Sequence, residues 1–282
     1  MIPAYNLHQH SKFSDGKETP GKYAEKALET GFWAIGFTEH SPLPFDTPFS
    51  LKKEEVNNYV TSIDRLKEEY KNRLEIYRAL EMDFIPQMSD NFDFWRKSVN
   101  ADYLIGSVHL VKPPHANRLW FTDGPDPAVY DLGIKKLFDN NVKKAVTHFY
   151  TQTLEMIETQ KFEIIGHFDK VKMHNNGRLF KENEKWYLIL IDKVIDLIKQ
   201  KNLIVEINTR GLYKKRYNGL FPGGIALKKV KQKNIPVIIS SDAHKPDEIN
   251  LCFEHAVNEL INEGFKSVMC LKNGTWQEVP LL

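Results

Sequence analysis

Short runs of apolar and β-branched residues alternate with segments of helical periodicity along almost the whole of this 282-residue chain. Alternation of strands with helices predicts a parallel sheet covered by helices. The number of units favours an α/β barrel related to the (β/α)₈ type, and an open doubly wound sheet is the alternative. The seven strand-like runs span residues 4–8, 32–38, 74–84, 103–111, 162–168, 203–207 and 236–240.

Local signals place the helices between these runs. Thr19 and Pro20 are typical of a helix start and Gly31 of its end. Ser50 is expected to cap a long helix with one apolar stripe between residues 56 and 70. Helical segments are further expected within 112–160, at 186–199, around 225–230 and at 248–263, and a last apolar run covers 267–271. No linker interrupts the pattern, so we expect residues 1–282 to form a single domain.

Composition argues against several classes of function. The net charge is +2 with both signs interspersed, so no nucleic acid is expected as a partner. The apolar runs are too short to cross a bilayer, and the N-terminus lacks the features of a secretion signal. Cys252 and Cys270 are expected to be reduced thiols. A cytoplasmic protein without a membrane partner is therefore expected.

Metal-binding side chains cluster at the ends of the expected strands, where six of the ten histidines lie. The carboxyl ends of parallel barrel strands share one face, on which such enzymes place their sites. His8 and His10 lie two residues apart on a strand and point to the same side, and Asp242 and His244 repeat that spacing. The candidate ligands are His8, His10, Asp15, His40, Glu81, His109, His167, Asp242 and His244.

Nine candidate ligands exceed what a single metal site uses. One zinc site takes three or four protein ligands, so the set is sufficient for about three divalent ions with open positions. Imidazole and carboxylate ligands suit Zn, Fe or Mn better than Ca or Mg. The sequence therefore predicts a cluster of about three metals, of undetermined identity, at the carboxyl ends of the strands.

These motifs, in this order, resemble the polymerase and histidinol phosphatase (PHP) family. The resemblance rests on the opening His8-Gln9-His10, on Asp15, Glu39-His40, Glu81, His109 and His167, and on the closing Asp242-Ala243-His244. It spans nearly the whole chain. The family implies a distorted (β/α)₇, TIM-like barrel and a trinuclear metal centre.

The resemblance also implies how the ligands divide among the metals. One metal would be bound by His8, His10, Glu81 and Asp242. Glu81, His109 and His167 would bind the second metal, and Asp15, His40 and His244 would bind the third.

Within the family, three phrases look like those of stand-alone histidinol phosphatases. They are Gly106-Ser107-Val108-His109, Gly166-His167-Phe168-Asp169 and Glu206-Ile207-Asn208-Thr209-Arg210. The implied activity is that of a phosphoric monoester hydrolase on a small-molecule substrate, L-histidinol phosphate.

A phosphatase of this kind would attack phosphorus with metal-activated hydroxide, while cationic side chains hold the phosphate oxygens. Arg210 follows the sixth strand and is a candidate phosphate ligand, with Arg178 as a weaker one. Asp242 is a candidate proton donor to the leaving alkoxide, with a metal-bound water as the alternative.

Other polar and aromatic residues leave two interpretations open. Glu39, Asp83 and Asp169 either orient a ligand histidine or are charges at the barrel mouth. His115 and His174 lie in loops of the active face and are candidates for substrate contact. The loop aromatics, Phe45, Phe49, Trp95 and Trp120, are expected to pack on the rim.

Three rival functions remain open from the sequence. A PHP nuclease or nucleotide phosphatase would be expected to show a basic, aromatic-lined track, which the dispersed lysines do not provide. A degenerate, non-catalytic PHP domain tends to lose ligands, whereas all nine are present. An amidohydrolase-type enzyme acting on C–N bonds would be expected to carry a bridging lysine at a strand end. The oligomeric state is not specified.

Overall fold

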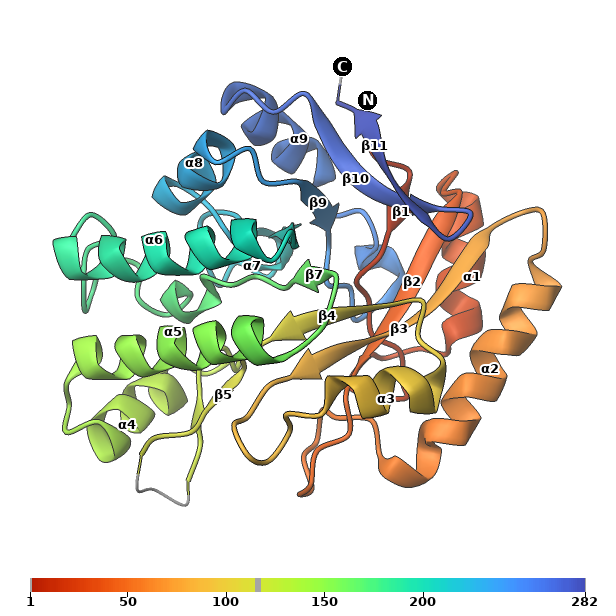
Figure 1. Cartoon of the computed structure of the whole chain (residues 1–282). Coiled ribbons are helices and arrows are strands. Elements are labelled where there is room, and N and C mark those ends of the chain that lie inside the picture. The colour runs from red at the N-terminus through yellow and green to blue at the C-terminus, as the bar shows by residue number, and fades with distance from the viewer. Residues whose placement is uncertain (1, 115–117, 282) are drawn as a thin grey trace.

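Seven parallel strands form the centre of the computed structural model, which describes residues 2–114 and 118–281 (Figure 1). Their order is β1-β2-β3-β4-β7-β8-β9, and every neighbouring pair is parallel. The predicted distorted (β/α)₇ barrel is therefore confirmed. The strands are β1 (Tyr5–Asn6), β2 (Ala34–His40), β3 (Glu75–Asp83), β4 (Tyr103–Ser107), β7 (Ile164–Ile165), β8 (Ile204–Asn208) and β9 (Val237–Ser240).

The first and last strands of the sheet meet only just beyond their carboxyl ends. Gln9 and Ala243 form a parallel bridge, and the amide of His10 donates to the carbonyl of Ala243 at 2.8 Å. The amide of Ala243 donates in turn to the carbonyl of His8 at 3.3 Å. This short closure brings His8-Gln9-His10 and Asp242-Ala243-His244 together at the barrel mouth.

Helices lie around the outside of the strands (Figure 1). Thr19 and Gly31 bound the first helix as predicted, and Gly31 has the positive φ of 76° that favours glycine after a helix. In the part of the chain that the structure describes, no helix is both long and apolar enough to span a bilayer. The α-helices are α1 (Pro20–Glu29), α2 (Val56–Glu69), α3 (Phe92–Val99), α4 (Pro127–Leu137), α5 (Val142–Thr159), α6 (Lys185–Gln200), α7 (Arg210–Tyr213), α8 (Ile225–Gln232) and α9 (Phe253–Asn262).

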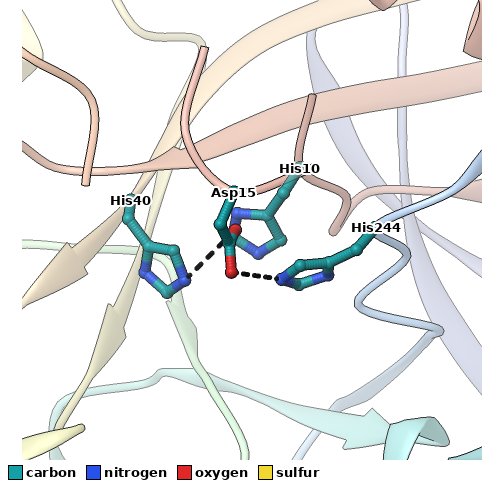
Figure 2. A group of neighbouring side chains, drawn as sticks. All are labelled: His10, Asp15, His40 and His244. Carbon is teal, nitrogen blue, oxygen red and sulfur yellow. Dashed lines mark hydrogen bonds and ion pairs between the residues drawn. The ribbon is translucent and has the colours of Figure 1, made fainter. Parts of the chain in front are cut away.

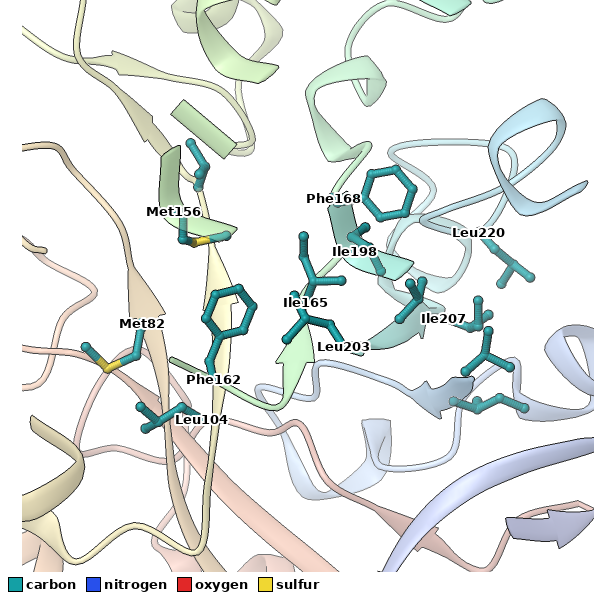
Figure 3. Packing of buried hydrophobic residues seen from close by; sticks show 14 of the residues in the cluster. Met82, Leu104, Met156, Phe162, Ile165, Phe168, Ile198, Leu203, Ile207 and Leu220 are labelled. Atoms are coloured by element: carbon teal, nitrogen blue, oxygen red, sulfur yellow. The ribbon is translucent and has the colours of Figure 1, made fainter. Parts of the chain in front are cut away.

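The larger hydrophobic core lies between the strands and these helices. Figure 3 shows part of it, with Met82 of β3 and Leu104 of β4 near Phe162, and Ile198 of α6 beside Ile165 of β7. Met156 of α5 and Ile198 of α6 pack in the same cluster as Met82, Leu104 and Phe162, and all of these side chains are buried. The helical stripes and the outward-facing strand positions thus bury each other.

A second apolar cluster fills the barrel itself, and each of the seven strands contributes to it. On β3, Tyr77 and Ala79 belong to this cluster, and Glu81, the next residue on the same face, begins the polar mouth. Gly36 leaves space for Tyr103, whose hydroxyl would lie 1.9 Å from an added Cβ. Along β3 the interior therefore changes from apolar to ionisable toward the carboxyl end.

Two hairpins flank the barrel. The C-terminal hairpin, β10 (Ser267–Lys272) with β11 (Thr275–Pro280), turns at Asn273-Gly274, both with positive φ, as favoured in two-residue hairpin loops. Cys270 and Leu271 join the interior cluster, so this hairpin closes the end opposite the mouth. The second hairpin pairs β5 (Leu110–Val111) with β6 (Trp120–Phe121).

Several predicted boundaries are wrong. Ser50 does not cap the long helix, because its hydroxyl lies 2.7 Å from that of Thr47 and a 3₁₀ turn, η1 (Lys53–Glu55), precedes α2. The last helix begins at Phe253 because Cys252 has a φ of 63°, and 248 lies in η3 (Pro246–Glu248). The first and fifth strands are shorter than expected because the chain leaves the ladder early to enter the mouth. Besides η1 and η3, the described residues form one more 3₁₀ turn, η2 (Lys170–Lys172).

Candidate metal centre

The nine predicted ligands converge at the barrel mouth. Their ligand atoms fall into groups within 4.8 Å of one another, and every member except Asp15 is buried. Figure 2 shows one group, in which three imidazoles surround the Asp15 carboxylate. The groups are His10-Asp15-His40-His244, His8-His10-Asp242, Glu81-His109-His167 and His40-Asp83-His109.

Glu81 lies at the centre of these groups. Its Oε1 is 2.9 Å from His167 Nε2 and 3.5 Å from His109 Nε2. Its Oε2 is 3.3 Å from His8 Nε2 and 3.4 Å from His10 Nε2. A carboxylate whose two oxygens face different imidazoles is suited to bridge two metals.

Two further carboxylates contact a ring nitrogen of three of the six ligand histidines. Glu206 contacts His8 Nδ1, so Nε2 of that ring faces the centre. Asp83 contacts Nδ1 of His109, and its Oδ2 is 3.0 Å from Nδ1 of His40. Such contacts fix the tautomer and orientation of a metal-binding imidazole. Of the two readings that the sequence left open for Asp83, the one that orients histidines is supported.

Glu39 has a different structural role from either predicted one. Its buried carboxylate accepts hydrogen bonds from the Ser11 amide at 3.0 Å, from the Ser11 hydroxyl at 2.6 Å, and from the Ser14 hydroxyl. It therefore positions the turn that leads to Asp15. Burial raises the pKa of Glu39 to about 7, against the lowering effect of the serine hydrogen bonds. Asp169 forms an ion pair with Lys172 at 2.8 Å and touches no ligand histidine.

The residues present fit bound divalent cations. Nε2 of His8 and Nε2 of His10 approach to 3.1 Å, and His10 Nδ1 and Asp15 Oδ1 are buried without a hydrogen-bond partner. Burial and the neighbouring His244 and His40 lower the pKa of His10 to about 3, so its imidazole is neutral as metal binding requires. Two ligands also have positive φ, 20° for His167 and 52° for Asp242, as found where a site holds strained backbone. The mouth can therefore bind several divalent metals.

A cavity of about 330 Å³ opens over the centre. Asp15, His40, Glu81, Asp242 and the aromatic rings of Phe49 and Phe121 line it, together with six cationic side chains. Lys17, Arg216 and Lys245 form no ion pair with any described residue. The cationic lining residues are Lys17, Lys170, Arg210, Lys214, Arg216 and Lys245.

The structure separates the two arginines that the sequence proposed as phosphate ligands. Arg210 lines the cavity and is 12% exposed, with Nη1 donating to the Asp242 carbonyl at 2.6 Å. Arg178 is not among the residues that line the cavity; it is 45% exposed and pairs with Asp131 at 2.9 Å. Arg178 therefore has a carboxylate partner outside the cavity lining, whereas Arg210 faces the cavity.

Two cavity residues, Asp123 and Lys170, were not identified from the sequence. Lys170 Nζ is 2.9 Å from Asp123 Oδ2 and 3.4 Å from Asp242 Oδ2, and all three side chains are buried. Burial alone would raise the pKa of Asp123, but Lys170 and His109 lower it. The only sequence signal for Lys170 was its position three residues after the candidate ligand His167. His174 is buried and donates to the Gly124 carbonyl at 2.7 Å, whereas His115 lies outside the described residues.

Comparison with known proteins identifies the family. A family model described as "PHP domain" matches residues 6–210, well over half of the chain. The chain belongs to the PHP domain family. The resemblance inferred from the motifs is thereby confirmed, and seven of the nine candidate ligands lie within the matched residues.

Relatives of this PHP domain include two curated proteins. A probable histidinol-phosphatase of Deinococcus radiodurans is 27% identical over 253 residues, 89% of each chain. A histidinol-phosphatase of Bacillus subtilis is 27% identical over 270 residues, 88% of this chain and 96% of that protein. A crystal structure of histidinol phosphate phosphatase from Lactococcus lactis, complexed with zinc, L-histidinol and phosphate, is 22% identical with a TM-score of 0.73, over 97% of this chain and 98% of that one. At that identity the likeness shows a shared fold.

Proposed function

We propose that this PHP domain is a histidinol-phosphatase that hydrolyses L-histidinol phosphate to L-histidinol and phosphate in histidine biosynthesis. The main support for a hydrolytic activity on phosphate esters is that nine candidate metal ligands converge beneath a cavity with six cationic side chains. The substrate follows from the names of the relatives and from the ligands named for the Lactococcus lactis structure. The ligand groups suit about three divalent ions, of which zinc is named for that relative.

The residues of the mouth suit phosphoryl transfer. When bound there, divalent metals supply a nucleophile at neutral pH and positive charge for the phosphoryl oxygens. Arg210 lines the same cavity, and its planar guanidinium can donate to two oxygens of one phosphate. Asp83 and Glu206 hold three imidazoles in fixed orientations, so the site needs little rearrangement as charge develops.

Asp242 is the proposed proton carrier. Burial alone would raise the pKa of Asp242, but Lys170, Arg210 and His8 lower it well below its ordinary value, so the carboxylate is ionised at rest. It can take the proton of the attacking water and return it to the leaving alkoxide, which yields the alcohol and inorganic phosphate. A metal-bound water is the alternative proton donor to the alkoxide.

Three broader assignments remain proposals. We propose that residues 1–282 form one domain, because the C-terminal hairpin contributes to the interior of the barrel. A cytoplasmic location and the absence of a nucleic-acid or membrane partner are retained from the sequence as predictions.

The test is phosphate release from L-histidinol phosphate by the metal-replete protein, beside a panel of nucleotides and p-nitrophenyl phosphate. We expect kcat/KM for L-histidinol phosphate to exceed the panel by several orders of magnitude, because binding outside the phosphate contributes to the transition state. A Glu81→Gln variant purified in parallel should be inactive, which excludes a contaminating phosphatase. A nucleotide as the best substrate would instead support the alternative PHP nucleotide phosphatase or nuclease.

A further inference from the structure

Asp123 is a buried carboxylate in the wall of the cavity, with one oxygen that has no hydrogen-bond partner among the described residues. Its Oδ2 lies 2.9 Å from Lys170 Nζ, while Oδ1 is unpartnered, and the residue is 8% exposed. A buried carboxylate oxygen without a donor is costly, and such groups are normally satisfied. Oδ1 is therefore suited to receive a donor from a ligand.

The other carboxylates of the cavity are not free for this purpose. Asp15, Glu81 and Asp242 each belong to a group whose ligand atoms converge on a metal position. Asp123 belongs to none of the four groups found in the described residues. With metals bound, Asp123 remains as the cavity's carboxylate able to attract an organic cation.

The backbone on both sides of Asp123 is fixed. The amide and the hydroxyl of Thr122 donate to the carbonyl of His109, at 3.0 and 3.1 Å. His174 Nε2 donates to the carbonyl of Gly124 at 2.7 Å. The carboxylate is thus held in place before a ligand binds, which limits the entropy lost on binding.

Asp123 also lies close to the proposed position of the phosphate. Its Oδ2 is 3.7 Å from His109 Nε2, and its partner Lys170 lies 3.4 Å from Asp242. In L-histidinol phosphate the carbon that bears the ammonium is separated from the ester oxygen by one methylene. An ester whose phosphate lies over the metals therefore places its ammonium near Asp123, with the imidazole farther out.

We propose that Asp123 accepts the ammonium group of the substrate and so selects amino-alcohol phosphates over uncharged phosphate esters. The inference rests on the proposed function and adds a specificity-determining residue to it. Lys17, Arg216 and Lys245 line the same cavity, form no ion pair within the described part of the chain, and repel an ammonium. A carboxylate inside this cationic rim compensates for that repulsion where the ammonium must lie.

Two substrates and two forms of the enzyme test this role. The substrates are L-histidinol phosphate and its deaminated analogue, imidazolylpropyl phosphate, and the enzymes are the wild type and Asp123→Asn. We expect the substitution to lower kcat/KM for L-histidinol phosphate by about a hundredfold and to change that for the analogue by less than about threefold. The metal content of each preparation is measured, and Asp139→Asn, at a carboxylate that is 86% exposed, is the matched control.

A measurement on the wild type alone protects the test against misfolding of the variant. L-Histidinol, which keeps the ammonium, should inhibit about a hundredfold more strongly than imidazolylpropanol, which lacks it. Equal inhibition by the two alcohols would overturn the assignment.

The outcomes separate this inference from the function on which it rests. Parallel loss of activity on both esters would mean that Asp123 acts only through Lys170 or the metals, and would overturn the inference. Equal wild-type activity on both esters would do the same while leaving the phosphatase activity in place. Failure of the wild type to hydrolyse either ester would instead overturn the proposed function.

Discussion

Single contacts with buried carboxylates orient three of the six ligand imidazoles. Asp83 contacts Nδ1 of both His40 and His109, and Glu206 contacts Nδ1 of His8. The sequence could place the ligands because they follow the strands, but it could not pair each ring with its acceptor. That pairing depends on which inward-facing residues of neighbouring strands lie side by side, and this is set by the register of the sheet.

The first residue-scale prediction concerns Asp83. Replacing it with Asn removes a charge that two ligand rings contact, so we expect metal affinity to fall by about 10- to 100-fold. Affinity is measured by metal retention during titration with a chelator, followed by elemental analysis. Asp139→Asn is the control because that carboxylate is exposed and pairs with Lys144. Wild-type metal retention in the Asp83 variant would show that its contacts do not tune the site.

The second residue-scale prediction compares the two arginines, of which Arg178 was already the weaker candidate from the sequence. Arg210→Ala should lower kcat/KM about 100-fold, mainly through a higher KM, because it removes a donor from the cavity. Arg178→Ala should stay within about twofold of the wild type, since that side chain pairs with Asp131 on the surface. Steady-state kinetics on the phosphate ester measure both. The reverse order of effects would place the phosphate elsewhere.

At the scale of elements, periodicity identified the strands and most helices, while their ends required tertiary context. Ser50 has the chemistry of a helix cap, but its hydroxyl lies against Thr47 and the helix starts at Val56. The strand β11 was missed although Asn273-Gly274 is a strong hairpin signal after an apolar run. The residues after that turn alternate only weakly, because the hairpin covers one end of the barrel and exposes its other face.

The element-scale prediction uses two neighbours on opposite faces of β11. Trp276 packs on Tyr103 with ring centroids 5.9 Å apart, whereas Gln277 is exposed. Trp276→Ala should lower the free energy of unfolding by about 2 kcal/mol, and Gln277→Ala by less than about 0.5 kcal/mol. Urea denaturation gives both values. Because the hairpin lies opposite the mouth, kcat/KM at 25 °C should not change; a loss of activity in the folded variant would contradict this placement.

For the whole molecule, alternation of elements was enough to predict the parallel barrel, but the place where it closes was not visible in the sequence. The ladder between β1 and β9 consists of a bridge between Gln9 and Ala243 and its hydrogen bonds. Proposed metal ligands lie next to the bridging residues on both chain segments: His8 and His10 beside Gln9, and Asp242 beside Ala243. Bound metals would thus link the two ends of the sheet where the backbone links them least.

Metal removal should therefore destabilise the whole barrel and loosen its closure first. Ligand binding to the native state alone, at about 1,000 times Kd, stabilises by about 4 kcal/mol per site, so chelation should lower Tm by about 10 °C or more. Hydrogen exchange gives the local readout. The amides of His10 and Ala243, which make the closing hydrogen bonds, should lose protection without metal, while those of the β10–β11 ladder should keep it. Adding zinc back should restore both Tm and protection, because binding is linked to the folded state. Unchanged protection at His10 and Ala243 after complete chelation would mean that side-chain packing alone closes the barrel, and that the metals serve only catalysis.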